Sequence, residues 1–325
     1  MIVSDILYGS FEVESVIEEL ISTKAVQRLK NIHMAGPAYL ANPLWNETRY
    51  EHSIGVMLLI RKLGGSIEEQ IAGLLHDISH TAFSHTVDIA MRIKEENYHE
   101  LIKEKVIEQS DIVMILEKHG FISDTILFDD SKFFLLEKEL PSLCADRLDY
   151  TLREVHRYFD VDLEEIHNFI NSLVIKENEI CVDTIMQAEW FVEMYNKIVL
   201  DFFYDPLNVI SNTIMSDVIF YAIKHDIFGE DELLLDDYQL YDVLSQTKDE
   251  FIDAQLNRFN HPFKFKIVTK NDKYTMHLKT KPRIIDPMVY QDGLKVHSSH
   301  LSKKIFDIKS RAILKSGYGI YLMVS

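Results

Sequence analysis

Histidines and an aspartate that could bind a metal gather in the segment 73–85, GLLHDISHTAFSH. His76, Asp77, His80 and His85 stand there together, directly after an apolar run. Imidazole nitrogens combined with carboxylate oxygens suit a divalent transition metal such as Fe, Mn, Ni, Co or Zn, whereas a site for Mg²⁺ alone favours oxygen ligands. The segment therefore predicts a metal site and, with it, metal-assisted chemistry.

Two other segments add residues of the same kind. TRYEHSIGV carries His52 near the start of a predicted helix, and Gly55 lies one turn later, where the missing side chain lets another backbone approach closely. LCADRLDYTLRE carries Asp146 on a second predicted helix. We expect three helices to present their polar side chains to one point.

Most of residues 11–258 shows the 3.6-residue periodicity of helices, and residues after about 262 alternate with the period of strands. Neighbouring residues diverge by about 100° on a helix, so His76 and Asp77 can face one point only at a helix end. The local signals predict a helix from Ser66 to about Asp77 and another that starts at Pro141 and reaches Phe159. They also predict a hairpin over 175–182 and two long helices over 183–228 that break near Asp205. Strands are expected on both sides of a turn at Asn271.

Composition places the chain among folded proteins, since 47% of its 325 residues are hydrophobic. It has no signal-peptide pattern and no apolar stretch long enough to span a membrane, and Cys144 and Cys181 have no metal-binding spacing, so we expect a soluble cytoplasmic protein with reduced thiols. The net charge of −18 disfavours nonspecific binding of nucleic acid. Residues 255–325, however, hold 14 Lys and Arg against 4 Asp and Glu. This basic segment either docks on the acidic remainder or forms an edge that binds a polyanion or a partner.

RYEHSIGV, AGLLHDISHTAFSH and ADRLDY resemble the signature blocks of the HD-domain metal-dependent phosphohydrolases. They are most similar to the branch of the SAM-and-HD-domain and bacterial deoxynucleoside triphosphate triphosphohydrolases, and the likeness covers roughly the first two thirds of the chain. The resemblance implies a mainly α fold. We expect an HD-type helical domain over residues 1–260, with its core motifs at 49–156, and a small basic α+β lobe over residues 261–325.

The resemblance also implies a role for each matched residue. It implies that the metal ligands are His52, His76, Asp77 and Asp146. It assigns His80 and His99 to the phosphates or to a second ion such as Mg²⁺, His85 with its orienting Asp88 to protonation of the leaving group, and Arg49, Arg147, Tyr150 and Glu154 to substrate binding.

The chain departs from this branch in ways that concern the substrate. Met34 and Ala35 stand where the relatives place a glutamine and a leucine under the deoxyribose. The stretch 195–208 has no arginine or histidine, whereas the relatives hold the triphosphate there with both. A monophosphate or a diester is therefore a plausible substrate as well.

A regulatory nucleotide site is matched only in part. Asp5 and Gln27 fall where the triphosphohydrolases contact an activating guanine nucleotide, but Lys30 replaces an arginine and lacks its planar fork. The competing interpretation is an N-terminal segment that simply packs on the helical core. Homo-oligomers are usual in the family, and we expect one here.

The sequence leaves several functions open. The leading hypothesis is a metal-dependent phosphohydrolase that acts on a nucleotide phosphoester and is similar to deoxynucleoside triphosphate triphosphohydrolases. The alternatives are a nucleotide monophosphatase or phosphodiesterase, a di-iron oxygenase built on the same ligands, and a nucleotide sensor without catalytic activity.

Overall fold

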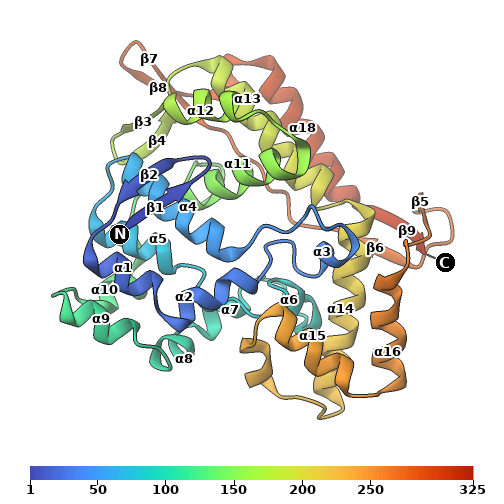
Figure 1. Ribbon diagram of the computed structural model, residues 1–325. Helices are drawn as coiled ribbons and strands as arrows, with labels where there is room; N and C mark the ends of the chain where they lie inside the picture. Colours follow the sequence, from blue (N-terminus) through green and yellow to red (C-terminus); the bar gives the residue numbers. More distant parts are fainter. Residues whose placement is uncertain (325) are drawn as a thin grey trace.

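The structure, a computed structural model, describes residues 1–324 and leaves out the side chain of residue 130. Its helices surround one central helix, α4 (Arg49–Lys62), which is buried over most of its length (Figure 1). A complete capping box starts α4, because Thr48 accepts from the Glu51 N–H and Glu51 accepts from the Thr48 N–H. The mainly helical fold expected from the sequence is confirmed.

Two helices pack against α4 and deliver the residues of the His-Asp segment and of ADRLDY. The helix α5 (Ile67–Leu75) starts at the N-cap Ser66 and stops just before His76, so His76 and Asp77 lie at a helix end, as expected. The helix α11 (Ala145–Phe159) does not start at Pro141 as the sequence suggested. Residues 141–144 lie outside the helix, and the extended backbone of Cys144 forms its N-cap.

The predicted break between two long helices is confirmed. The helix α13 (Ile185–Asn196) continues into the π-helix η3 (Lys197–Phe202), and α14 (Pro206–Lys224) begins after Asp205, whose carboxylate accepts from the Leu207 N–H. The C-terminal helix α18 (Lys303–Tyr318) runs along α13 (Figure 1).

A four-stranded sheet joins the C-terminal segment to the helical part. The predicted hairpin is confirmed as β3 (Leu173–Lys176) and β4 (Glu179–Val182), which turn through two residues of positive φ. The strand β7 (Met288–Gln291) pairs in parallel with β4, and β8 (Leu294–His297) pairs antiparallel with β7. Residues 261–324 therefore complete a sheet that residues 173–182 begin.

The second C-terminal sheet has an unexpected strand order. The strands β5 (Phe265–Val268) and β6 (Met276–Leu278), which flank the predicted turn, do not pair with each other, because β9 (Ile320–Val324) lies between them. Burial explains this order, since Leu322 of β9 is fully buried on Ile210 and Ile214 of α14. The most apolar strand takes the central position, where it buries the most surface.

The remaining elements complete the envelope. They are the strands β1 (Ile2–Asp5) and β2 (Gly9–Glu12), the 3₁₀-helices η1 (Leu29–Asn31), η2 (Asp130–Lys132), η4 (Glu230–Leu234) and η5 (Asn257–Asn260), and the helices α1 (Ser15–Ile21), α2 (Lys24–Arg28), α3 (Ala38–Ala41), α6 (Thr86–Met91), α7 (Tyr98–Leu101), α8 (Lys103–Glu108), α9 (Ile112–Lys118), α10 (Ser123–Leu127), α12 (Leu163–Asn171), α15 (Asp237–Gln246), α16 (Glu250–Leu256) and α17 (Ser298–Leu301). None of the helices within residues 1–324 has the length and apolar character needed to cross a membrane.

Candidate metal centre and substrate cavity

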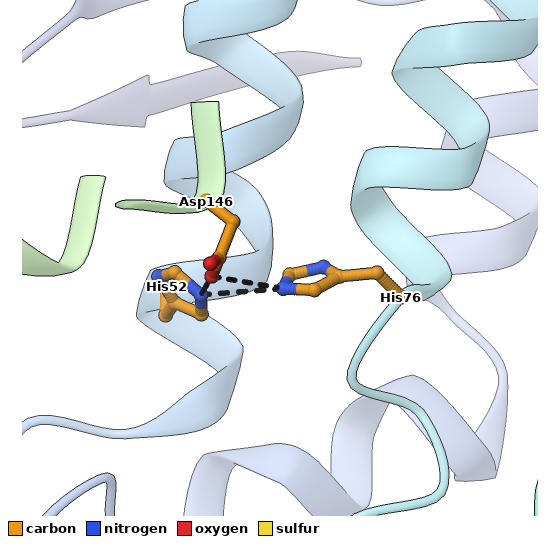
Figure 2. A group of neighbouring side chains, drawn as sticks. All are labelled: His52, His76 and Asp146. Carbon is orange, nitrogen blue, oxygen red and sulfur yellow. Dashed lines mark hydrogen bonds and ion pairs between the residues drawn. The ribbon is translucent and has the colours of Figure 1, made fainter. Parts of the chain in front are cut away.

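Three side chains from separate helices meet at the end of α5. His52 Nε2 lies 3.3 Å from His76 Nε2 and 3.0 Å from Oδ1 of Asp146, and His76 Nε2 lies 3.6 Å from the same oxygen (Figure 2). Asp77 joins them, since its Oδ1 lies 3.5 Å from His76 Nε2 and its Oδ2 lies 3.9 Å from His52 Nε2. The structure thus brings together all four residues expected to bind the metal.

The hydrogen bonds behind the two imidazoles fit a metal. His52 Nδ1 lies 2.8 Å from Oδ2 of Asp149, and His76 Nδ1 lies 2.8 Å from the carbonyl oxygen of Gly73. If both Nδ1 atoms donate, the Nε2 lone pairs point toward each other and toward a carboxylate, which is unfavourable unless a proton or a metal cation lies between them. Although burial opposes it, hydrogen bonds to Asp146 and Asp149 raise the pKa of His52 to about 10, so the cluster attracts positive charge.

Gly55 makes room for the residues that hold His52. Arg153 binds Asp149 twice, through Nη2 to Oδ1 at 2.7 Å and through Nε to Oδ2 at 3.1 Å. A Cβ atom on Gly55 would lie 2.0 Å from both Arg153 Nη2 and Asp149 Oδ1. The close approach expected at Gly55 is therefore present, but side chains rather than a backbone make it.

A second group of possible ligands shares Asp77. Its Oδ1 lies 3.3 Å from His80 Nε2, and the rings of His80 and His99 stack with their centroids 3.9 Å apart. Burial lowers the pKa of His99 to about 4, so its ring is neutral at pH 7. Arg49 forms an ion pair with Asp77 and also donates to Ser84 Oγ. Asp77, His80 and His99 can together hold a cation, and Arg49 stands beside them as a fixed positive charge.

His85 and Asp88 form a pair on the next turn. His85 Nδ1 lies 3.0 Å from Asp88 Oδ2, while Asp88 Oδ1 accepts from the Tyr98 N–H at 2.9 Å. Asp88 is buried, whereas 46% of the His85 side chain is exposed. The pairing orients the imidazole, whose Nε2 has no hydrogen bond to the residues that the structure describes.

A cavity of about 840 Å³ adjoins these groups, which is within the size range of small-molecule sites. Its walls include ten of the residues expected from the sequence: Met34, Arg49, His76, Asp77, His80, His85, His99, Asp146, Tyr150 and Glu154. His52 and Asp88 do not line the cavity but contact residues that do. His52 contacts Asp146, and Asp88 contacts His85.

Arg147 differs from its expected position. Its guanidinium donates to the carbonyl oxygens of Ser142 at 2.7 Å and Lys138 at 3.2 Å, and to Cys144 Sγ at 3.2 Å. Arg147 is absent from the residues that line the cavity. It holds the segment before α11, where it supplies donors to two backbone carbonyl groups.

Other cations line the cavity in its place. Lys279 and Arg283 come from the C-terminal segment, with His277 beside them, and Lys103 comes from α8. Only the excess of lysine and arginine after residue 255 signalled Lys279 and Arg283 in the sequence, and no signal pointed to Lys103. The basic segment docks on the helical part and supplies a wall of the cavity.

The residues matched to a regulatory site have other contacts. Asp5 forms a buried ion pair with Arg153 at 2.8 Å. Gln27 donates to the carbonyl oxygen of Ile21, and the Lys30 ammonium lies 4.7 Å from the centre of the Tyr50 ring. None of the three lines the cavity.

The chain is similar to known proteins over this region and over its whole length. The HD domain family matches residues 49–154. The chain is 44% identical over 324 residues to the uncharacterized protein YdhJ of Bacillus subtilis, a match that covers 100% of this chain and 99% of that protein. It is 38% identical over 175 residues to the metal-dependent phosphohydrolase cns2 of Cordyceps militaris, which covers 53% of this chain and 50% of cns2.

A more distant relative and a solved structure also match the chain. The human deoxynucleoside triphosphate triphosphohydrolase SAMHD1 is 30% identical over 146 residues, or 38% of this chain and 23% of that protein. A solved phosphohydrolase from Bacteroides thetaiotaomicron has the same fold, with a TM-score of 0.74 at 18% identity over 100% of this chain and 99% of that one. The chain, in one family with YdhJ, belongs to the HD superfamily of metal-dependent phosphohydrolases.

Proposed function

We propose that this enzyme hydrolyses a phosphoester of a nucleotide and that deoxynucleoside triphosphates are its leading substrate class. One observation carries the proposal: a single cavity places the His-Asp cluster beside cations that suit phosphates and beside aromatic rings that suit a nucleoside. Its size also suits a nucleotide.

The residues around the cluster divide the work on the phosphates. His52, His76, Asp77 and Asp146 would hold a transition metal, which when bound would supply Lewis acidity for activating water and polarising the phosphoryl group. Arg49, fixed by Asp77 and Ser84, offers a charge to the phosphoryl oxygens. His80 and His99 donate to the same oxygens or hold a second ion such as Mg²⁺.

The leaving group requires a proton, and His85 is the residue to provide it. Its Nδ1 lies 3.0 Å from Asp88 Oδ2, a contact that holds the ring in one orientation for the transfer. Asp88 is a positioning residue in this scheme, because it reaches the substrate only through His85.

The nucleoside meets a different wall. Tyr150 and Phe203 offer ring surfaces for a base or a sugar, and Met34 stands where the triphosphohydrolases contact the deoxyribose. Glu154 lines the same region as a hydrogen-bonding group.

A monophosphatase or phosphodiesterase activity is the second candidate. It is favoured by Phe202 and Phe203, which line the cavity from the stretch that carries arginine and histidine in the triphosphohydrolases. Fewer phosphate contacts from this side suit a smaller phosphate group.

A nucleotide panel tests the proposal. The purified protein is analysed for bound metal and assayed with Mn²⁺, Fe²⁺, Ni²⁺ and Mg²⁺ on nucleoside mono-, di- and triphosphates and cyclic diesters. Release of inorganic triphosphate from deoxynucleoside triphosphates supports the leading class, whereas orthophosphate from monophosphates supports the second candidate. Turnover of no nucleotide with any metal contradicts both.

The chain offers a matched control for this assay. The variant His76→Ala/Asp77→Ala should lose both metal and turnover. A second His-Asp dipeptide, His225–Asp226, ends α14 and is not part of the cavity wall. The variant His225→Ala/Asp226→Asn should therefore keep both, and equal behaviour of the two variants would show that the proposed centre is not the catalytic one.

A further inference from the structure

An ion pair joins two cavity-lining segments that are far apart in the sequence. Glu96 lies in the loop between α6 and α7, and Arg283 lies in the C-terminal segment before β7. The Nη2 atom of Arg283 lies 2.6 Å from Oε2 of Glu96, and both residues line the cavity. Each side chain keeps 38% of its surface exposed, so a ligand in the cavity can reach the pair.

Arg283 has a defined place in the cavity wall. Its guanidinium carbon lies 5.5 Å from the centre of the Phe203 ring, within the range of a cation–π contact. Phe203 belongs to the stretch 195–208, which has no arginine or histidine of its own. The stretch 195–208 therefore contributes no guanidinium group to this wall of the cavity. Arg283 supplies one beside Phe203, and its planar guanidinium can bind a phosphate in two places.

Glu96 is held in an uncommon backbone conformation. Its φ of +58° lies in the left-handed region, which residues other than glycine seldom adopt unless surrounding contacts hold them there. From this conformation the Glu96 side chain reaches Arg283. The Glu96 carboxylate presents to Arg283 the same kind of oxygen that a phosphate would present.

We propose that Arg283 is the receptor for the non-reacting phosphates of the substrate and that Glu96 occupies this receptor until a phosphate displaces it. The proposal rests on the nucleotide phosphohydrolase function proposed above. Displacement exchanges one oxygen anion for another, so the guanidinium stays paired throughout. Substrates with more phosphates gain more from this exchange, which makes the pair a determinant of phosphate number.

The first test removes the receptor. Arg283→Ala should raise KM for the deoxynucleoside triphosphate that the wild type hydrolyses fastest by roughly tenfold or more, with kcat changed much less, because the lost contact is charge-assisted and remote from the bond that breaks. Lys281→Ala is the matched control, since Lys281 is exposed, lies two positions away and does not line the cavity. It should leave KM within about twofold of wild type.

The second test removes the competitor. Glu96→Gln should lower KM by up to roughly fivefold, the effect expected of a partly exposed ion pair. Glu95→Gln removes an adjacent exposed charge and should change KM less. In the double variant Glu96→Gln/Arg283→Ala the benefit of Glu96→Gln should vanish, because Glu96 acts only through Arg283.

Binding of inorganic triphosphate to the metal-loaded protein, measured by calorimetry, separates this inference from the proposed function. If no nucleotide is hydrolysed but Arg283→Ala weakens triphosphate binding by tenfold or more and Glu96→Gln strengthens it, the receptor stands and the substrate class is wrong. If nucleotides are hydrolysed but Arg283→Ala, still folded by circular dichroism, leaves KM and triphosphate binding unchanged, the receptor is wrong. Additive effects in the double variant would overturn the role of Glu96.

Discussion

The Nδ1 atom of His52 lies 2.8 Å from Oδ2 of Asp149, so a carboxylate outside the four-residue cluster orients one of its imidazoles. Asp149 is fully buried and bound in turn by Arg153. The orientation of His52 in the His-Asp cluster therefore depends on two buried side chains of α11, Asp149 and Arg153.

Replacement of Asp149 by asparagine should weaken metal binding by roughly 10- to 100-fold, because the imidazole loses both its orienting partner and part of its basicity. Titration of the metal-free protein with Mn²⁺ or Zn²⁺ measures the effect. Asp160→Asn, at the exposed end of the same helix, is the control and should bind metal as the wild type does. Unchanged metal affinity of a folded Asp149→Asn protein would contradict this role.

Gly55→Ala should disrupt the same contacts from the other side. A Cβ atom there would overlap with Arg153 and Asp149. The free energy of unfolding should therefore fall by about 1–3 kcal/mol, and much of the metal affinity should be lost. Thermal unfolding and metal analysis check both effects. Gly317→Ala is the matched control, since Gly317 lies in α18 with no atom within 4 Å of its added Cβ, and it should be neutral or slightly stabilising.

His85→Ala should lower kcat on nucleotides by roughly 10²- to 10⁴-fold, the usual contribution of a general acid. The loss should be far smaller with a p-nitrophenyl phosphoester, because p-nitrophenolate leaves without a proton. Asp88→Asn should show the same substrate dependence at a smaller amplitude. Equal losses on both substrates would mean that His85 does not protonate the leaving group.

Glu154 should make the stability of the protein depend on pH. Burial raises the pKa of Glu154 to about 8, and its Oε2 has no hydrogen-bond partner among the described residues. An unfolded glutamate ionises near pH 4.3. Between these values the unfolded chain has lost its proton and the folded protein has kept it, so stability falls as pH rises from about 4.3 to 8.

Glu154→Gln, which does not titrate, should therefore gain stability relative to the wild type as pH rises through this window. We expect the difference in unfolding free energy to grow by at least about 1 kcal/mol between pH 5 and pH 8. Urea unfolding at several pH values measures it, and Glu139→Gln at an exposed site should show no such trend. A constant difference at all pH values would exclude ionisation of Glu154 as the cause.

Local signals predicted a large part of the fold. Ser66 as a helix start, the hairpin at 175–182 and the break at Asp205 all depend on residues within a few positions of each other, and all are present. The convergence of His76 with Asp146 was also expected, because both are ligand-type residues on predicted helices and both match the HD signature blocks.

Contacts that neither a helical pattern nor a signature block reveals escaped prediction. The orientation of Arg147 depends on the carbonyl oxygens of residues 138 and 142, which a helical pattern does not reveal. The pairing of β9 with both β5 and β6 depends on the apolar surface of α14, more than a hundred residues earlier. Arg283 lines the cavity because of the same nonlocal packing. In the sequence, only its place in the basic segment 255–325 indicated that it would bind an anion or dock on the acidic part of the chain.

The central position of β9 limits the order in which parts of the protein can form during synthesis. Every residue of the candidate metal cluster, from residue 52 to residue 146, is synthesised long before β9. The strand β6 brings His277 to the cavity, and it cannot join its sheet until β9 has been translated. In a nascent chain the residues of the His-Asp cluster therefore precede β9 by well over a hundred positions, and this wall of the cavity can be completed only after β9 has been made.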